Sequence, residues 1–383
     1  MKVIKLEVFP INIPYTHKEV SYLVSRAGVS DVIVKLTADN GLVGWGESCM
    51  NCETEGIVAA VKAAAPFVLG RDPWDKDAIA RDFYIGGGWQ FQPMTGNFAF
   101  AGIDMALWDL CGKECGQPLY RLFGGALREQ VDYFYYLQWG GAEEVAAQCQ
   151  DGVARGYSAF YFKVGVNAKA EGALLEVIRY SIGAERKIRI DANQAWTVPQ
   201  AAKILNEWHS AFDLDFVEAP VRIEPIENML DLQRRVSVPL CANEGLWREA
   251  DAARIIRSRA ADYLCFSSYW VGTLGRFHSL IHAAAREGLE VCKHTHGEFG
   301  LAATAGQHLM LNAPNSGCGG HQQTAQMMAD DILTEALPIA TGPRWGRIDK
   351  PGLGVEVDED KLMKYHEAFL RDGEFTPYGE RFR

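Results

Sequence analysis

From about residue 130 onward, short apolar runs alternate with longer stretches that have helical periodicity. AFYFKVG (159–165) precedes EGALLEVIRYSIG, and KIRIDAN (187–193) precedes VPQAAKILNEWHSA. The alternation continues through four further apolar runs, DFVEAP, PLCANE, DYLCFSS and EVCKHTH. Strands that alternate with helices predict a parallel sheet. The unit recurs so regularly that a closed (β/α) barrel is favoured over an open sheet.

The first 125 residues have a different pattern. DVIVKLTADNGLVGWGES (31–48) places an Asp-Asn-Gly turn between two alternating runs, which predicts a β-hairpin, and two helical stretches follow. We therefore expect an α+β domain at residues 1–125 and a barrel at residues 126–345. The C-terminal segment, 346–383, is expected to pack back on the first domain.

A polar residue closes each apolar run of the barrel region, and successive members lie 23 to 28 residues apart, about one βα unit. The carboxyl ends of parallel barrel strands open on one face, where active sites are built. We therefore expect these side chains to ring one mouth of the barrel: Lys163, Asp191, Glu218, Glu244, Ser267, His294 and His321.

Three neighbouring members of this series are carboxylates: Asp191, Glu218 and Glu244. Three like charges at one mouth repel one another unless a cation lies among them. Ligand sets made only of oxygen favour a hard divalent ion. The pattern thus predicts a Mg²⁺ site, although each carboxylate alone is more typical of a solvated loop.

Basic side chains flank the predicted metal site. Lys163 follows Tyr161 by two residues, so both point to the same side of a strand. A nearby divalent cation would lower the pKa of Lys163 and suit it to act as a base, although a surface lysine at a strand end fits the pattern equally well. His294 and His296 share one side of a later strand, and we expect one of them to be catalytic. Glu298 and His321 are weaker candidates.

Composition excludes several function classes. The chain has 383 residues, 48% of them apolar, and a net charge of −11, which argues against a nucleic-acid binder. No apolar run of about 18 residues predicts a membrane span, and the first residues do not resemble a signal peptide. The nine cysteines are scattered along the chain, and we expect them to be reduced in a cytoplasmic protein.

Longer stretches of the sequence resemble a known family. The chain is similar to the enolase superfamily, in its mandelate racemase/muconate lactonizing enzyme branch, over nearly its whole length. The resemblance is carried by GLVGWGE (41–47), GIDMALWDLCGKECGQPLYRLFGG (102–125), YFKVG (161–165), RIDANQAW (189–196), FVEAP (216–220), ANEG (242–245), APNSG (313–317) and PGLGVEVD (351–358).

The resemblance implies a fold and a chemistry. The fold would be an α/β architecture, an α+β capping domain over a (β/α)₇β TIM-type barrel. The chemistry would be removal of the proton α to a carboxylate, giving an enediolate held by Mg²⁺ on Asp191, Glu218 and Glu244. A glutamate as third ligand resembles the mandelate racemase-like subgroup.

The family resemblance also suggests how the substrate is held. The substrate would be a small-molecule carboxylate, and the capping loops near residues 15–22 and 49–53 would close over it. We expect substrate contacts from Asn193, Glu298, His321 and Tyr22. The resemblance further suggests a homo-oligomer.

Two departures from the family pattern shape the expected reaction. Tyr161 stands where the family often has a lysine two residues before the base, and Ser267 stands where it has an aspartate or a lysine. Lys163 remains as base, and His294, His296 or Tyr161 remains to protonate a departing hydroxyl. We therefore expect a dehydratase of an acid sugar or related hydroxy-carboxylate. The alternatives are a cycloisomerase, a racemase or epimerase, or a barrel that binds metal without catalysis.

Overall fold

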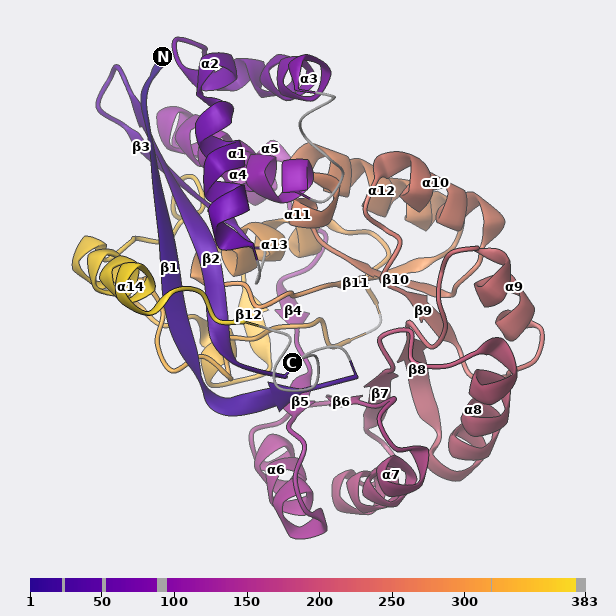
Figure 1. Cartoon of the computed structure of the whole chain (residues 1–383). Coiled ribbons are helices and arrows are strands. Elements are labelled where there is room, and N and C mark those ends of the chain that lie inside the picture. Colours follow the sequence, from indigo (N-terminus) through magenta and orange to yellow (C-terminus); the bar gives the residue numbers. More distant parts are fainter. Residues whose placement is uncertain (23–24, 50–52, 88–94, 318, 377–383) are drawn as a thin grey trace.

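The computed structural model describes residues 1–22, 25–49, 53–87, 95–317 and 319–376. A long antiparallel hairpin opens the chain and forms, with a third strand, the sheet β1-β2-β3. The helices that follow this sheet in the first part of the chain pack on one side of it (Figure 1). The elements of this part are β1 (Val3–Val20), β2 (Ser25–Ala38), β3 (Val43–Ser48), α1 (Thr54–Ala63), α2 (Ala65–Val68), a 3-10 turn (Pro73–Asp75), α3 (Lys76–Gly86), α4 (Thr95–Cys115) and α5 (Leu119–Leu122).

The central part is a curled parallel sheet in the order β11-β10-β9-β8-β7-β6-β5. Its strands are β5 (Tyr135–Leu137), β6 (Ala159–Lys163), β7 (Lys187–Asp191), β8 (Leu214–Glu218), β9 (Leu240–Ala242), β10 (Tyr263–Phe266) and β11 (Glu290–Lys293). Residues 320–322 close the ring. The Phe134 amide donates to the His321 carbonyl on one side, and the Gln322 amide donates to the Lys293 carbonyl on the other.

Helices surround this barrel (Figure 1). They are α6 (Ala142–Ala154), α7 (Ala168–Ile182), α8 (Val198–Phe212), α9 (Glu227–Gln233), α10 (Glu249–Ser258), α11 (Ser268–Val271), α12 (Leu274–Arg286) and α13 (Gly300–Asn312). Each crossover carries the chain to the neighbouring strand, so the strand order follows the sequence order. The predicted architecture, a capping domain with a TIM-type barrel, is confirmed.

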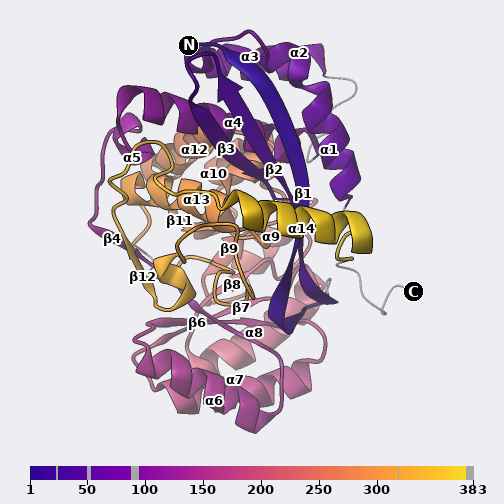
Figure 2. The same ribbon diagram turned by 90° about the vertical axis from the view of Figure 1, so that its left-hand side faces the viewer.

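The C-terminal part returns to the first sheet. A short strand, β12 (Arg344–Gly346), pairs with β4 (Gln130–Asp132), and a 3-10 turn (Pro338–Ala340) precedes it. The last helix, α14 (Glu359–Asp372), packs on β1 and crosses in front of it in Figure 2. His366 on this helix contacts the Pro10 carbonyl at 2.8 Å, and Glu359 pairs with Lys35 of β2 at 2.8 Å.

The polar positions of β7 lie inside the barrel. Arg189 is completely buried, and its guanidinium lies 4.5 Å from the centre of the Phe216 ring and 2.8 Å from the Asp215 carboxylate. Asp191 follows two residues later and shares this inner side. Ile188 and Ile190 alternate with them. The strand therefore ends in a carboxylate because its inner side leads to the mouth of the barrel.

Candidate active site at the barrel mouth

The ends of neighbouring strands bring the expected polar residues together. Lys163, Asp191 and Glu218 are the last residues of β6, β7 and β8. In the strand register, Lys163 pairs with Asp191, and Asp191 pairs with Glu218. Glu244 comes two residues after β9, and His294 directly follows β11. The backbone thus places the carboxylates side by side at one edge of the barrel.

Hydrogen bonds join the first carboxylate to its neighbours. The Lys163 Nζ lies 2.5 Å from Asp191 Oδ2, and the Tyr161 hydroxyl donates to the same oxygen at 2.8 Å. Tyr161 also lies 3.4 Å from Glu218 Oε2, to which Gln322 donates at 2.6 Å. These donors hold the carboxylates in fixed orientations.

Asn193 connects three members of the site. Its side-chain oxygen accepts a hydrogen bond from Lys163 at 3.2 Å, and its amide nitrogen donates to Glu244 Oε1 at 3.2 Å. Its backbone amide donates to Asp191 Oδ1 at 2.8 Å. The backbone has φ 44° here, a left-handed conformation that asparagine tolerates better than most residues.

The carboxylate cluster has the properties of a cation site. Burial and the neighbouring Asp191 raise the pKa of Glu218 well above its usual value, and the same causes raise the pKa of Glu244 to about 7. Glu218 Oε1 and Glu244 Oε2 are buried and have no hydrogen-bond partner. Buried anionic oxygens without partners are costly, and a divalent cation would satisfy both. The residues therefore fit Mg²⁺.

Lys163 carries a proton in this arrangement. Burial lowers the pKa of Lys163, but the carboxylates of Asp191 and Glu218 raise it by more, so it lies above its usual value. The sequence led us to expect a lowered pKa, and that expectation depended on a cation to offset the carboxylates. The pKa of Lys163 is therefore raised when no cation is bound, and a bound cation would lower it.

A cavity of about 160 Å³ opens beside these groups. Lys163, Tyr161, Asn193 and Glu244 line it, together with both candidate histidines. Burial lowers the pKa of His294 well below its usual value, and burial lowers that of His296 to about 3. Both imidazoles are therefore neutral at neutral pH. Their ring centroids lie 5.7 Å apart.

The capping domain contributes an ion pair that the sequence did not indicate. Glu19 of β1 and Arg26 of β2 pair at 2.5 Å, both are buried, and both line the cavity. Tyr136 of the barrel donates to Glu19 at 2.7 Å. The hairpin β1-β2 thus reaches the barrel mouth. No local signal distinguishes these two residues from ordinary surface charges of a hairpin.

Two tryptophans form an aromatic wall that the sequence also did not indicate. Trp247 and Trp270 stack with ring centroids 4.1 Å apart, and Trp270 lies 4.5 Å from the His294 ring. Ser267, which directly follows β10, is uncharged and donates to the His294 carbonyl. Tyr269 lies 3.4 Å from His294 Nδ1. A hydroxyl thus occupies the place beside this histidine.

Two expected substrate contacts lie outside the cavity lining. Glu298 forms a buried ion pair with Lys293, and the His321 Nδ1 accepts a hydrogen bond from the Lys293 amide at 2.9 Å. The second contact joins β11 to the closing segment, and the first joins β11 to the loop that follows it. Both side chains are thereby engaged in the scaffold, which a strand-end position alone does not reveal.

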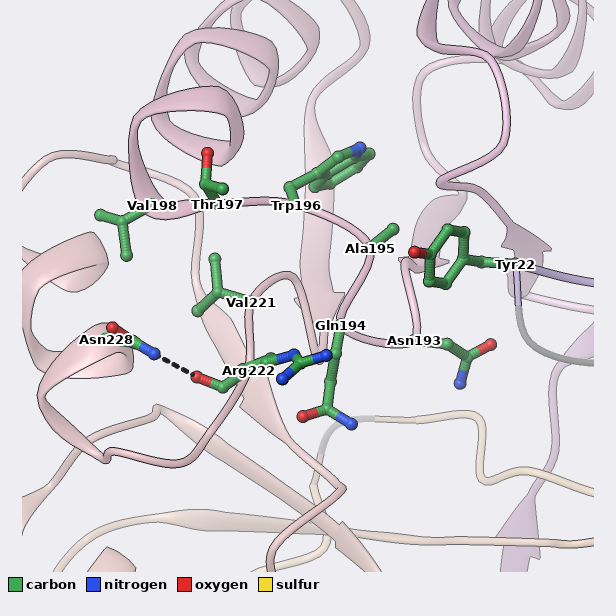
Figure 3. Close-up of a pocket in the computed structure, with 10 residues that line it drawn as sticks. All are labelled: Tyr22, Asn193, Gln194, Ala195, Trp196, Thr197, Val198, Val221, Arg222 and Asn228. Carbon is green, nitrogen blue, oxygen red and sulfur yellow. Dashed lines mark hydrogen bonds between the residues drawn. The ribbon is translucent and has the colours of Figure 1, made fainter.

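Tyr22 lines an adjoining pocket of about 380 Å³. Figure 3 shows its ring beside Ala195, with Asn193 next to it and Arg222 beside Gln194. Asn193 lines both this pocket and the cavity. The expected loop at residues 49–53 includes residues 50–52, which lie outside the described part of the chain.

Family comparisons match both halves of the chain. Residues 12–124 match "Mandelate racemase / muconate lactonizing enzyme, N-terminal domain", and residues 144–361 match "Enolase C-terminal domain-like". In the part of the chain that the structure describes, no helix has the length and apolar character needed to cross a membrane.

Curated relatives have different reactions. An N-succinyl-L-Arg/Lys racemase of Bacillus cereus is 25% identical, over 95% of this chain and 98% of its own length. An L-Ala-D/L-Glu epimerase of Clostridium acetobutylicum is 29% identical, over 86% of this chain and 91% of its own length. A D-galactonate dehydratase of Pectobacterium atrosepticum is 26% identical, over 87% of this chain and 90% of its own length.

Solved structures share the whole architecture. The N-succinyl Arg/Lys racemase of Bacillus cereus superposes with a TM-score of 0.87 at 26% identity, covering 95% of this chain and 98% of that one. An enolase of Thermobispora bispora, complexed with magnesium and formate, superposes with a TM-score of 0.90 at 23% identity. The match covers 100% of this chain and 96% of that one. The second likeness shows the fold alone.

Proposed function

The chain belongs to the mandelate racemase/muconate lactonizing enzyme family of the enolase superfamily, and from this premise we propose that it removes the proton α to a carboxylate. Lys163 is the base, and β-elimination of water from a hydroxy-carboxylate follows. The observation that supports this most is the position of Lys163 among three buried carboxylates at the edge of the cavity.

The metal would be held by Asp191, Glu218 and Glu244. Mg²⁺ bound there supplies a positive charge that stabilises the negative charge developing on the substrate carboxylate. A cation held there would offset the charges of Asp191 and Glu218 and so weaken the attraction that raises the pKa of Lys163. Burial then favours the neutral amine, which is the form that accepts a proton.

A second group must protonate the departing hydroxyl. His294 and His296 line the same cavity as Lys163 and lie just after β11, which is not a neighbour of β6. Both are neutral and can donate an N–H proton toward the cavity. An acid on a different strand from the base suits elimination, because the two groups then act on different atoms of the substrate.

An epimerase is the second candidate. Lys163 and a histidine on separate strands also suit removal of a proton on one side of the α-carbon and its return on the other. Racemases and epimerases at 25% and 29% identity favour this reading. Against it, the residue that follows β10 is Ser267 rather than a charged acid or base.

Proton NMR in D₂O distinguishes these reactions. The Mg²⁺-loaded protein is incubated with acid sugars, lactones and N-acylamino acids. A dehydratase replaces the α-proton signal with that of a 2-keto product. Exchange or inversion of the α-position without loss of water would assign an epimerase instead, and no change in any substrate with Mg²⁺ bound would contradict the proposal.

The histidine assignment has its own test. We expect His294→Gln to retain exchange of the α-proton while formation of the keto product falls by about 10²-fold or more. The same measurement on His296→Gln shows which imidazole serves as the acid. Equal loss of exchange and of product in both variants would place the histidines in substrate binding.

A further inference from the structure

Three thiols form a layer inside the barrel beside the magnesium ligands. Cys241, Cys265 and Cys292 lie on the consecutive strands β9, β10 and β11 and are 0% exposed. Cys265 pairs with Cys292 in the strand register, and its thiol interacts with the thiols on both sides. None of the three is in a disulfide. Without a cation they act as small apolar side chains.

Glu218 connects this layer to the mouth of the barrel. It pairs with Cys241 in the register of β8 and β9. One ligand atom each from Glu218, Cys241 and Cys265 lies within 4.8 Å of the other two. In tetrahedral coordination with metal–sulfur bonds of about 2.3 Å, neighbouring ligand atoms lie about 3.8 Å apart. Rotation of the thiols about their Cα–Cβ bonds covers the difference.

The carboxylate has an oxygen to offer. Glu218 Oε2 accepts hydrogen bonds from Gln322 and Tyr161, whereas Oε1 is buried without a hydrogen-bond partner. Gln322 and Tyr161 both line the cavity, so Glu218 lies directly behind residues of the cavity wall. The unpartnered oxygen is an observation independent of the thiols.

We propose that Glu218, Cys241 and Cys265 form a second metal site, selective for a thiophilic cation such as Cd²⁺, Zn²⁺ or Cu⁺. Sulfur ligands select these ions over Mg²⁺. Binding of a divalent ion converts the two thiols to thiolates, and the two protons pass to solvent. The bound ion uses Glu218, so it competes with Mg²⁺. The expected competition with Mg²⁺ rests on the proposed function. The site formed by Glu218, Cys241 and Cys265 does not depend on it.

Cadmium binding tests the site directly, because Cd²⁺–thiolate bonds absorb in the ultraviolet. We expect one Cd²⁺ per chain to produce this absorption in the complete protein, and excess Mg²⁺ to weaken its binding. Absorption that is independent of Mg²⁺ would keep the thiol site and remove Glu218 from the proposed magnesium set. Absence of thiolate absorption at saturating Cd²⁺ would overturn the inference.

Matched variants locate the ion. Cys241→Ser with Cys265→Ser should abolish the absorption. Cys49→Ser is the control, because Cys49 is buried beside Asp31 and Glu47 in a comparable cluster, and it should leave the absorption unchanged. If circular dichroism shows that the double variant is unfolded, Cys265→Ala alone should weaken Cd²⁺ binding at least about tenfold. Loss of absorption in Cys49→Ser alone would place the ion elsewhere and contradict the proposal.

Discussion

At the scale of single residues, Asn193 explains how the mouth of the barrel is ordered. It contacts Lys163, Asp191 and Glu244 at once, and its left-handed backbone turns the chain away from β7 toward them. From the sequence, Asn193 was expected to contact the substrate. The structure shows contacts to the base and to two proposed metal ligands, so its substitution should disturb all three.

Glu244 tests the proposed metal set without a substrate. Glu244→Gln removes a charge and a strong ligand. Loss of an outer-shell partner already lowers metal affinity about 10- to 100-fold, so we expect the affinity for Mg²⁺ to fall by at least about tenfold. Calorimetry with Mg²⁺, or magnetic resonance with Mn²⁺, measures this. Glu249→Gln is the control, because Glu249 is mostly exposed and pairs only loosely with Arg276. Equal affinity in parent and Glu244→Gln would remove Glu244 from the set.

At the scale of elements, spacing in the sequence revealed the strand ends, since each βα unit places one residue at the same edge. Lys163, Asp191 and Glu218 could be predicted in this way because each terminates its own strand. The pair Glu19–Arg26 could not. Its position depends on the length of the hairpin β1-β2, which carries both residues away from the capping sheet to Tyr136 of the barrel. That long-range contact has no local sequence pattern.

Close packing of β3 on α4 provides a test at this scale. A Cβ atom at Gly46 would overlap the Gly102 carbonyl oxygen of α4, and neither backbone can move easily. We expect Gly46→Ala to lower the free energy of unfolding by about 1–3 kcal/mol or more, as overpacking does. Thermal unfolding measures the change.

Gly275→Ala is the matched control for this substitution. A Cβ atom there meets nothing within 4 Å, and the residue lies in α12, where alanine favours the helix. We expect unchanged or slightly increased stability. If Gly46→Ala is as stable as Gly275→Ala, the capping sheet does not pack on α4 as described.

At the scale of the whole molecule, buried polar groups join the capping domain, the barrel and the C-terminal segment. Glu47 of β3 accepts hydrogen bonds from the amides of Phe299 and Ala302 at the start of α13, at 2.6 and 2.9 Å. His308 in α13 accepts from the Tyr120 amide at 3.2 Å and contacts the Leu353 carbonyl at 3.0 Å. His308 is buried in α13 and does not line the cavity, so it packs in the interior.

His308 makes stability depend on pH. Burial lowers its pKa to about 4, against about 6.5 in an unfolded chain. Between these values the unfolded chain binds more protons, so the folded state loses stability as pH falls. We expect the stability advantage of the parent over His308→Gln to shrink by about 2 kcal/mol between pH 7 and pH 5. Denaturant unfolding at both values measures it, and a constant advantage would show that His308 is protonated equally in both states.

Lys163 is the proposed base, and exchange of the substrate α-proton for deuterium measures its contribution. The measurement compares the Mg²⁺-loaded parent with Lys163→Met, using Lys187→Met as the control, since Lys187 lies at the start of β7 and is partly exposed. We predict that exchange falls at least about 10³-fold in Lys163→Met and is unchanged in the control. Exchange at the parental rate in Lys163→Met would contradict the account.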